Sequence, residues 1–339
     1  MRQRLGAAVL ATLMCASSAA AESKIQQWSD LEGWAEDDHA AARSVLLNTC
    51  NQLKGPEWSA VCVLARKADT ARDYFERNFT PVMVSDGEGG LFTGYYEPEL
   101  SGSLTKNDKF KYPIRRRPSE AEGNSPWLSR KDIETSNVLN GRDLEIAWLS
   151  DPVDKFFLQV QGSGRIRMDD GESLRVGYGG KNGHPYRSVG KELVRQGIFE
   201  SHQVSAGTIR KWVKQHPSKG TKLLWHNPSY VFFREVKNLA EDKGPIGAMN
   251  RPVTAGRSIA VDPKFVPLGA PVWIEKNGKL PLRRLMVAQD TGSAIKGAQR
   301  GDIFFGSGKE AGKVAGRTKD KGRMVVLLPT DVANTLVND

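Results

Sequence analysis

Three aspartates in the C-terminal quarter of the chain lie where a carboxyl group could transfer a proton. Asp290 ends the strand-like run RRLMVAQD and precedes a Thr-Gly pair, Asp302 opens the run DIFF, and Asp262 opens DPKFVPLG. A carboxyl group at the end of an apolar strand is partly desolvated, so its pKa can rise enough for it to donate a proton. Asp290 fits this chemistry best. The alternative for each aspartate is a turn cap, the commoner role of Asp before Pro or at the end of a strand.

Other readings of the same stretch are less well supported. The sequence Asp290-Thr291-Gly292-Ser293 spells an aspartic protease loop, but such enzymes need two loops whose carboxylates share a proton, and Asp69-Thr70-Ala71 lacks the glycine. Gly306-Ser307-Gly308 fits neither nucleotide-binding glycine pattern. The five histidines show no metal-ligand spacing, so neither a metal nor another cofactor is expected.

The elements that must position these residues change along the chain. From residue 25 to residue 79 apolar residues recur at helical spacing, and after Pro81 short β-rich runs broken by glycine dominate. Between residues 100 and 244 we expect strands at KFFLQVQ, RIRMDDGESLRVGY and SYVFFREV, and two helices over Val189–Gln196 and Ala206–Gln215, the second capped by Ser205. From residue 247 to residue 329 the strands are spaced as in a closed barrel, with a short helix over Lys309–Ala315.

Composition and the N-terminal residues predict an exported protein. Of its 339 residues 39% are hydrophobic and 26% charged, and residues 1–21 have the basic start, apolar run and small-residue end of a signal peptide. Met14 precedes Cys15, which argues against a lipid anchor there. The two remaining cysteines, Cys50 and Cys62, lie in neighbouring helical patterns and predict a disulfide.

The charge balance predicts the kind of partner. The formal net charge is +10, and 47 basic against 39 acidic residues remain once residues 1–21 are removed. For an exported basic protein, nucleic acid is an improbable partner, and a cell-wall polymer or lipid headgroups are more plausible. The alternative is that the charge only keeps the protein soluble.

Five motifs in a fixed order resemble the membrane-bound lytic transglycosylase A family: LFTGYYEPEL, KFFLQVQGSGRI, VGYGGKNGHPYRSVGK, NPSYVFFRE and the block over residues 247–328. The last block also resembles the three-aspartate domain, a double-psi β-barrel. This resemblance implies a mainly β fold with added helices. Residues 22–99 and 245–339 would form the barrel domain with its N-terminal helices, residues 100–244 would form an inserted, smaller β-barrel-like domain, and glycan would lie in the groove between them.

The resemblance implies a lyase that cleaves the β-1,4 bond between N-acetylmuramic acid and N-acetylglucosamine without water and leaves a 1,6-anhydro ring. Asp290 would act as acid and then as base, with Asp302 and Asp262 in support. The rival interpretation is a non-catalytic peptidoglycan-binding barrel. A peripheral contact with the outer membrane or with a cell-wall complex would accompany a periplasmic location. The substrate-binding residues would be Thr93, Tyr95, Tyr96, Glu97, Gln159, Gln161, Gly162, Ser163 and Gly164.

The expected substrate-binding residues would contact a sugar in different ways. The rings of Tyr95 and Tyr96 offer apolar faces to sugars, although aromatic residues in a strand more often belong to the core. Gln159, Gln161 and Ser163 could form hydrogen bonds with N-acetyl and hydroxyl groups, and the glycines beside them allow a close approach of the backbone. Glu97 is the nearest candidate for a second carboxylate of the reaction, but it could instead only cap the turn before Pro98, and we favour a binding or structural role.

Overall fold

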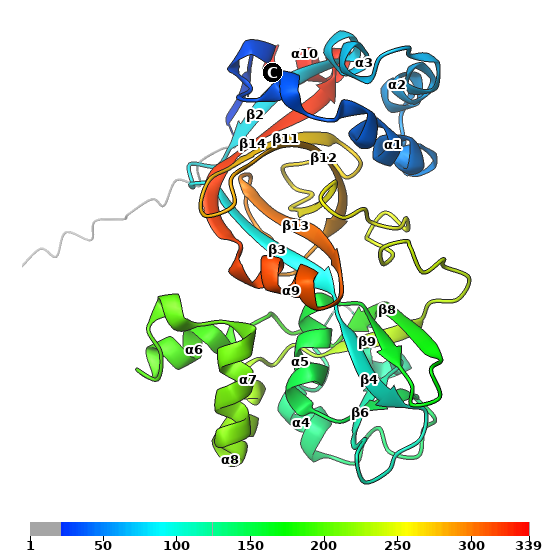
Figure 1. Ribbon diagram of the computed structural model, residues 1–339, viewed down its shortest axis with the longest axis vertical. Helices are drawn as coiled ribbons and strands as arrows, with labels where there is room; N and C mark the ends of the chain where they lie inside the picture. Colours follow the sequence, from blue (N-terminus) through cyan, green and yellow to red (C-terminus); the bar gives the residue numbers. More distant parts are fainter. Residues whose placement is uncertain (1–21, 124, 339) are drawn as a thin grey trace, which may run out of the picture.

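The computed structural model describes residues 22–123 and 125–338, so the predicted signal peptide lies outside the described residues. Two bodies are visible in Figure 1, one formed by the two ends of the chain and the other by its middle. The chain passes from the first body to the second at Pro98, between strand β3 (Leu91–Glu97) and strand β4 (Glu99–Ser103).

The first body is a closed barrel of six strands with mixed directions. Strands β14, β11, β12, β10, β13 and β3 are joined in that order, and β14 also pairs with β3, which closes the barrel. Strands β10 and β12 are parallel, as are β13 and β3, and the other pairs are antiparallel. The further strands are β10 (Ser258–Val261), β11 (Pro271–Lys276), β12 (Leu282–Thr291), β13 (Arg300–Ser307) and β14 (Lys319–Pro329). The predicted barrel is thereby confirmed.

Alternate residues of these strands fill the barrel. Phe92, Ile259, Val272, Met286 and Ile303 are buried in one apolar cluster, as the two-residue period of a strand requires. Two more strands, β2 (Phe79–Ser85) and β1 (Glu22–Ile25), extend the sheet beyond β14. Helix α9 (Gly308–Arg317) follows β13, where a short helix is predicted, and α10 (Thr330–Asn338) ends the described chain.

Three N-terminal helices cover one side of the barrel (Figure 1). They are α1 (His39–Thr49), α2 (Pro56–Lys67) and α3 (Ala71–Asn78), and their apolar residues pack with Trp273 and Leu285 of the barrel. The expected disulfide is present between Cys50, directly after α1, and Cys62 in α2.

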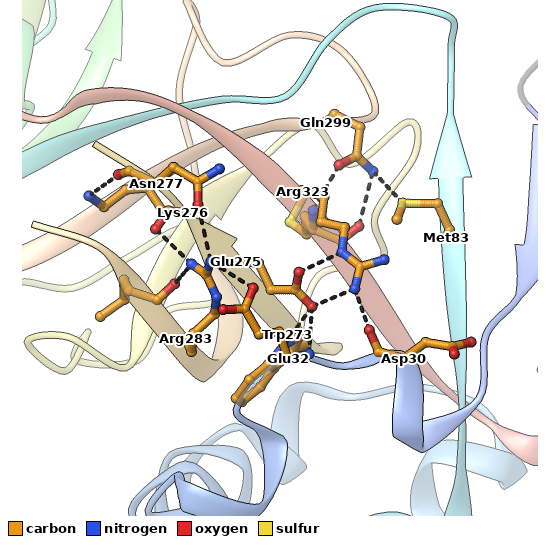
Figure 2. A network of polar contacts seen from close by, with 12 residues as sticks. Asp30, Glu32, Met83, Trp273, Glu275, Lys276, Asn277, Arg283, Gln299 and Arg323 are labelled. Carbon is orange, nitrogen blue, oxygen red and sulfur yellow. Dashed lines mark hydrogen bonds and ion pairs between the residues drawn. The ribbon is translucent and has the colours of Figure 1, made fainter. Parts of the chain in front are cut away.

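A polar network fastens the N-terminal segment to the barrel (Figure 2). Glu275 of β11 accepts two hydrogen bonds from Arg323 of β14, at 2.6 and 2.7 Å, and one from the indole N–H of Trp273. Its carboxylate also accepts from the backbone N–H of Glu32 at 3.1 Å, while Arg323 donates to the carbonyl of Asp30. Residues 30–32 are therefore held by two strands more than 240 positions away in the sequence.

The second body is a curled six-stranded sheet with helices. Its strands are joined in the order β5-β6-β4-β7-β8-β9. Pairs of Cα atoms in the outer strands β5 and β9 lie within 8 Å, so the sheet curls back on itself. The strands not yet given are β5 (Tyr112–Arg115), β6 (Glu145–Leu149), β7 (Gly164–Arg167), β8 (Ser173–Lys181) and β9 (Val231–Glu235). The helices are α4 (Arg130–Thr135), α5 (Pro152–Gln161), α6 (Val189–Arg195), α7 (Ala206–Gln215) and α8 (Pro217–His226).

Helix α5 corrects the prediction for KFFLQVQ, which forms a helix and not a strand. The carboxylate of Asp151 accepts from the backbone N–H of Val153 at 2.7 Å, Pro152 occupies the first turn, and Gly162 ends the helix in the left-handed region. These are start and stop signals of a helix, and they outweigh the short apolar run between them. The predictions for α6 and α7 are correct, and Ser205 caps α7 as expected.

Candidate active site

The parallel pair β3 and β13 brings the candidate residues together. Its register places Thr93 beside Asp302 and Tyr95 beside Phe304. Because Phe92 and Ile303 point into the barrel core, these four side chains point out of it, toward the insert. Residues more than 200 positions apart thus form one surface, on which Thr93, Asp302 and the Tyr95 hydroxyl are polar and the ring of Phe304 packs on Tyr95.

A pocket of about 230 Å³ lies over this surface, between the barrel and the insert. Of the predicted residues, Thr93, Tyr95, Gln159, Gln161 and Asp302 line it. The structure adds residues that the sequence did not single out: Arg130, Tyr186, Asn227, Ser229 and Arg300, together with the loop over residues 292–295. Of the described residues that line this pocket, Asp302 alone carries a carboxyl group.

Asp302 is held in a polar chain at the floor of the pocket. The hydroxyl of Thr93 donates to its carboxylate and in turn accepts from the guanidinium of Arg300 at 2.8 Å. Burial, together with the smaller effect of the Asp290 charge, raises the pKa of Asp302 to about 6 against the opposing effects of the Thr93 hydrogen bond and the Arg300 charge. A carboxyl group with this pKa exchanges its proton near neutral pH.

Asp290 lies next to this chain, and hydrogen bonds occupy both its oxygens. The backbone N–H groups of Ala248 and Thr291 donate to one oxygen at 3.0 and 2.9 Å, and the hydroxyl of Tyr95 donates to the other at 2.9 Å. Burial raises the pKa of Asp290, although all three hydrogen bonds lower it. Asp290 is not among the residues that line the pocket.

Asp262, the third predicted aspartate, holds the loop between β12 and β13. It is buried, with 2% of its surface exposed, and it accepts from the backbone N–H of Gly297 at 3.0 Å and from that of Lys264 at 3.3 Å. The same loop carries the pocket residues 292–295. The hydrogen bond from Gly297 to Asp262 therefore helps to fix this part of the pocket wall, although Asp262 does not line the pocket itself.

The residues predicted on the insert side occupy different environments. Gln161 accepts from the backbone N–H of Tyr96 at 3.1 Å, and Gln159 donates to the carbonyl of Val231 at 2.8 Å. Ser163 is 7% exposed. Gly164 owes its size to packing, because a Cβ there would lie 2.4 Å from a methyl group of Leu158 and 3.1 Å from the carbonyl of Pro98. Gly162 is the helix terminator described above.

Glu97 lies at the junction of the two bodies, fully buried. Its carboxylate accepts from Arg165 at 2.8 Å, from Arg175 twice at 3.0 Å, and from the hydroxyl of Ser307 at 2.7 Å. The two arginines also donate to carbonyls of residues 240–243. Glu97 therefore joins strands of both bodies to the returning chain, and it does not line the pocket.

Comparison with known proteins decides the family. The family described as MltA specific insert domain matches residues 91–234, and the 3D domain matches residues 257–328. Membrane-bound lytic murein transglycosylase A of Escherichia coli K12 is 39% identical over 254 residues, which cover 72% of this chain and 67% of that protein. The chain belongs to the membrane-bound lytic murein transglycosylase A family.

Solved structures of the family agree with the fold. A membrane-bound lytic murein transglycosylase from Agrobacterium tumefaciens is 34% identical with a TM-score of 0.83, covering 92% of this chain and 99% of that one. Escherichia coli MltA with bound chitohexaose is 30% identical with a TM-score of 0.73, covering 91% and 94%.

Within residues 22–123 and 125–338, no helix is long and apolar enough to cross a bilayer. Across the same ranges, no group of three or more His, Cys, Asp or Glu side chains is arranged to hold a metal ion.

Proposed function

We propose that this chain is a peptidoglycan lytic transglycosylase, a lyase that cleaves the β-1,4 bond from N-acetylmuramic acid to N-acetylglucosamine and closes a 1,6-anhydro ring. The observation that carries the proposal is a pocket between barrel and insert in which Asp302 has the one carboxyl group among the described lining residues. The relatives' name and the family member with bound chitohexaose support a glycan substrate of this kind.

One carboxyl group suffices for this reaction because no water takes part. Protonated Asp302 donates its proton to the glycosidic oxygen, and the bond from that oxygen to C1 of the muramic acid breaks. The 6-hydroxyl of the same sugar then attacks C1 and gives its proton to the Asp302 carboxylate, which restores the starting state. Hydrolases instead place a second carboxylate about 5 to 9 Å away to act as nucleophile or as a base for water.

We assign the proton donor to Asp302 and not to Asp290, the residue that the sequence favoured. The geometry supports Asp302, which lines the pocket and has a pKa of about 6. Asp290 lies outside the pocket lining, and both its oxygens already accept hydrogen bonds. In this assignment Asp290 fixes the ring of Tyr95 through the hydroxyl group, and its negative charge keeps Asp302 protonated at higher pH.

The predicted cellular location and binding partner are part of the same proposal. The chain would be exported to the periplasm and would act on glycan strands, with any contact with the outer membrane or a cell-wall complex being peripheral. The residues that line the pocket from the insert, Gln159 and Gln161 among the predicted ones, would bind the polar groups of the sugars.

Product analysis tests the proposal against its rivals. Purified peptidoglycan is incubated with the protein, and the soluble fragments are analysed by mass spectrometry. Fragments ending in 1,6-anhydromuramic acid support the transglycosylase. Reducing ends that carry added water would indicate a hydrolase, and binding without soluble products would indicate a non-catalytic glycan-binding barrel.

A further inference from the structure

The segment between two residues of the pocket wall carries much of the chain's positive charge. Tyr186 and Asn227 both line the pocket, and the backbone N–H of Arg187 donates to the side chain of Asn227 at 3.1 Å, so the segment begins and ends at one place. Residues 187–226 contain eight Lys and Arg against two Glu, a formal net charge of +6, whereas the whole chain has +10.

Helices α6, α7 and α8 of this segment form a group beside α5, on the side away from the insert's strands (Figure 1). Their apolar residues pack on α5, whose Val153 and Phe156 belong to the same buried cluster as Ile209, Val213 and Leu223. Because the C-terminal end of α5 carries Gln159 and Gln161 into the pocket, the helical group is fixed relative to the pocket by shared packing.

The charged side chains lie on the outer faces of these helices. On α7 the buried residues are Ile209 and Val213, and at 100° per residue Lys211 and Lys214 point away from them. On α8, Lys222 points away from the buried Gly220, Leu223 and Leu224, and the exposed Lys219 lies at the edge of that buried side. These four lysines are exposed and define the α7–α8 basic face.

The cations of the basic face are not neutralised by the protein. Within the part of the chain that the structure describes, none of the four lysines forms an ion pair, whereas Arg210 pairs with Asp154 and Arg195 with Glu192. Uncompensated like charges on one face repel one another, and an anionic partner relieves that repulsion. The basic face is thus suited to a partner that carries negative charge.

We propose that the α7–α8 basic face binds the carboxylates of the peptides that hang from peptidoglycan, and so holds the enzyme on native wall while the pocket cleaves the glycan. This inference rests on the proposed function. The peptides are attached to the lactyl groups of muramic acid and carry free carboxylates, so a glycan in the pocket presents negative charge to its surroundings. Exposed charges act over about 8 Å at physiological salt and steer association, so the effect is one of affinity and not of the chemical step.

A neutralised variant with a matched control tests the proposal. The test variant replaces the basic face by Lys211→Gln, Lys214→Gln, Lys219→Gln and Lys222→Gln. The control removes the same charge from exposed lysines elsewhere, by Lys54→Gln, Lys67→Gln, Lys279→Gln and Lys321→Gln. Binding is measured by pelleting with intact peptidoglycan and with glycan chains freed of peptides by an amidase. Release of anhydromuramyl products is measured on both substrates.

The test variant should bind intact peptidoglycan about 10-fold more weakly than the wild type at low salt. High salt should abolish this difference, and the control should bind like the wild type. On peptide-free glycan all three proteins should bind and cleave alike.

Three results would overturn the proposal. The first is an equal loss of peptidoglycan binding in the control, and the second is an equal loss of binding by the test variant on peptide-free glycan. The third is a test variant that binds peptidoglycan like the wild type but no longer binds anionic phospholipid vesicles, which would assign the face to a lipid surface. A wild type that pellets with intact peptidoglycan but releases no anhydromuramyl product from either substrate would reject the proposed function, while the pelleting comparison would still decide on the face.

Discussion

Replacing Asp302 by asparagine should greatly lower the cleavage rate and stabilise the fold at neutral pH. The pKa of the Asp302 carboxyl is about 6 in the folded protein against an ordinary value of 3.8. Between these two pH values the folded protein holds a proton that the unfolded chain has lost, so the free energy of unfolding falls as the pH rises and is lowest above pH 6. The difference between the two pKa values corresponds to about 3 kcal/mol.

Asparagine keeps an oxygen that can accept from Thr93 and removes the buried charge. Asp302→Asn should therefore raise the free energy of unfolding by up to about 3 kcal/mol at pH 7.5 and by only about 1 kcal/mol at pH 4.5. The cleavage rate should fall about 10² to 10⁴-fold, the usual effect of general acid catalysis. Denaturant unfolding at the two pH values and release of anhydromuramyl products measure the two effects.

Asp108→Asn is the matched control, because Asp108 is exposed on the insert and its replacement should change neither quantity. Two outcomes would refute the assignment of Asp302. One is a gain in stability of equal size at both pH values, which would show that the carboxyl is not desolvated. The other is a residual rate above roughly a tenth of wild type, far from the loss expected for a proton donor.

Three further predictions concern residues around the site and the frame that holds it. Asp290→Asn should move the alkaline limb of the profile of kcat/KM against pH to lower pH, because the charge of Asp290 raises the pKa of Asp302; a limb that stays in place would show that the two groups are uncoupled. Replacing both Cys50 and Cys62 by serine should cost about 2 to 4 kcal/mol in urea unfolding, and a smaller loss would mean that helix packing alone holds α1 and α2 together. Glu97→Gln leaves two buried arginines unpaired and should cost about 3 to 5 kcal/mol in thermal or urea unfolding; an unchanged midpoint would contradict a structural role.

The sequence predicts the barrel well because its signals are local. Short apolar runs rich in β-branched residues and separated by glycine and proline turns are visible in the C-terminal block, and the helices α6, α7 and α9 carry the expected periodicity or caps. The strand prediction for KFFLQVQ is wrong because its aromatic and β-branched residues favour a strand. The residues that indicate a helix, the N-cap Asp151 and the C-cap Gly162, lie outside this stretch.

The choice between two aspartates could not be made from the sequence. Asp290 and Asp302 both lie in β-strands of the barrel. The features that separate them are the N–H donors around Asp290 and the position of Asp302 in the pocket, and these depend on tertiary structure. The sequence does not predict that Arg130, Tyr186 and Asn227 line the pocket, because these residues come together only when the insert folds. The motifs NGHPYR, which contains Tyr186, and HNPS, which contains Asn227, do indicate turns.

The interleaved order of the barrel strands constrains how the chain matures. Strand β3 pairs with β13 and β14, more than 200 residues later, while residues 99–235 form their own sheet in between. During synthesis from the N-terminus, the insert can fold early, but the barrel remains open until β14 arrives, and closing so long a loop is slow. A chain that stops before Lys319 lacks the strand that joins β2, β3 and β11. Incomplete copies thus have no closed site, and a wall-degrading activity arises only once synthesis is nearly complete.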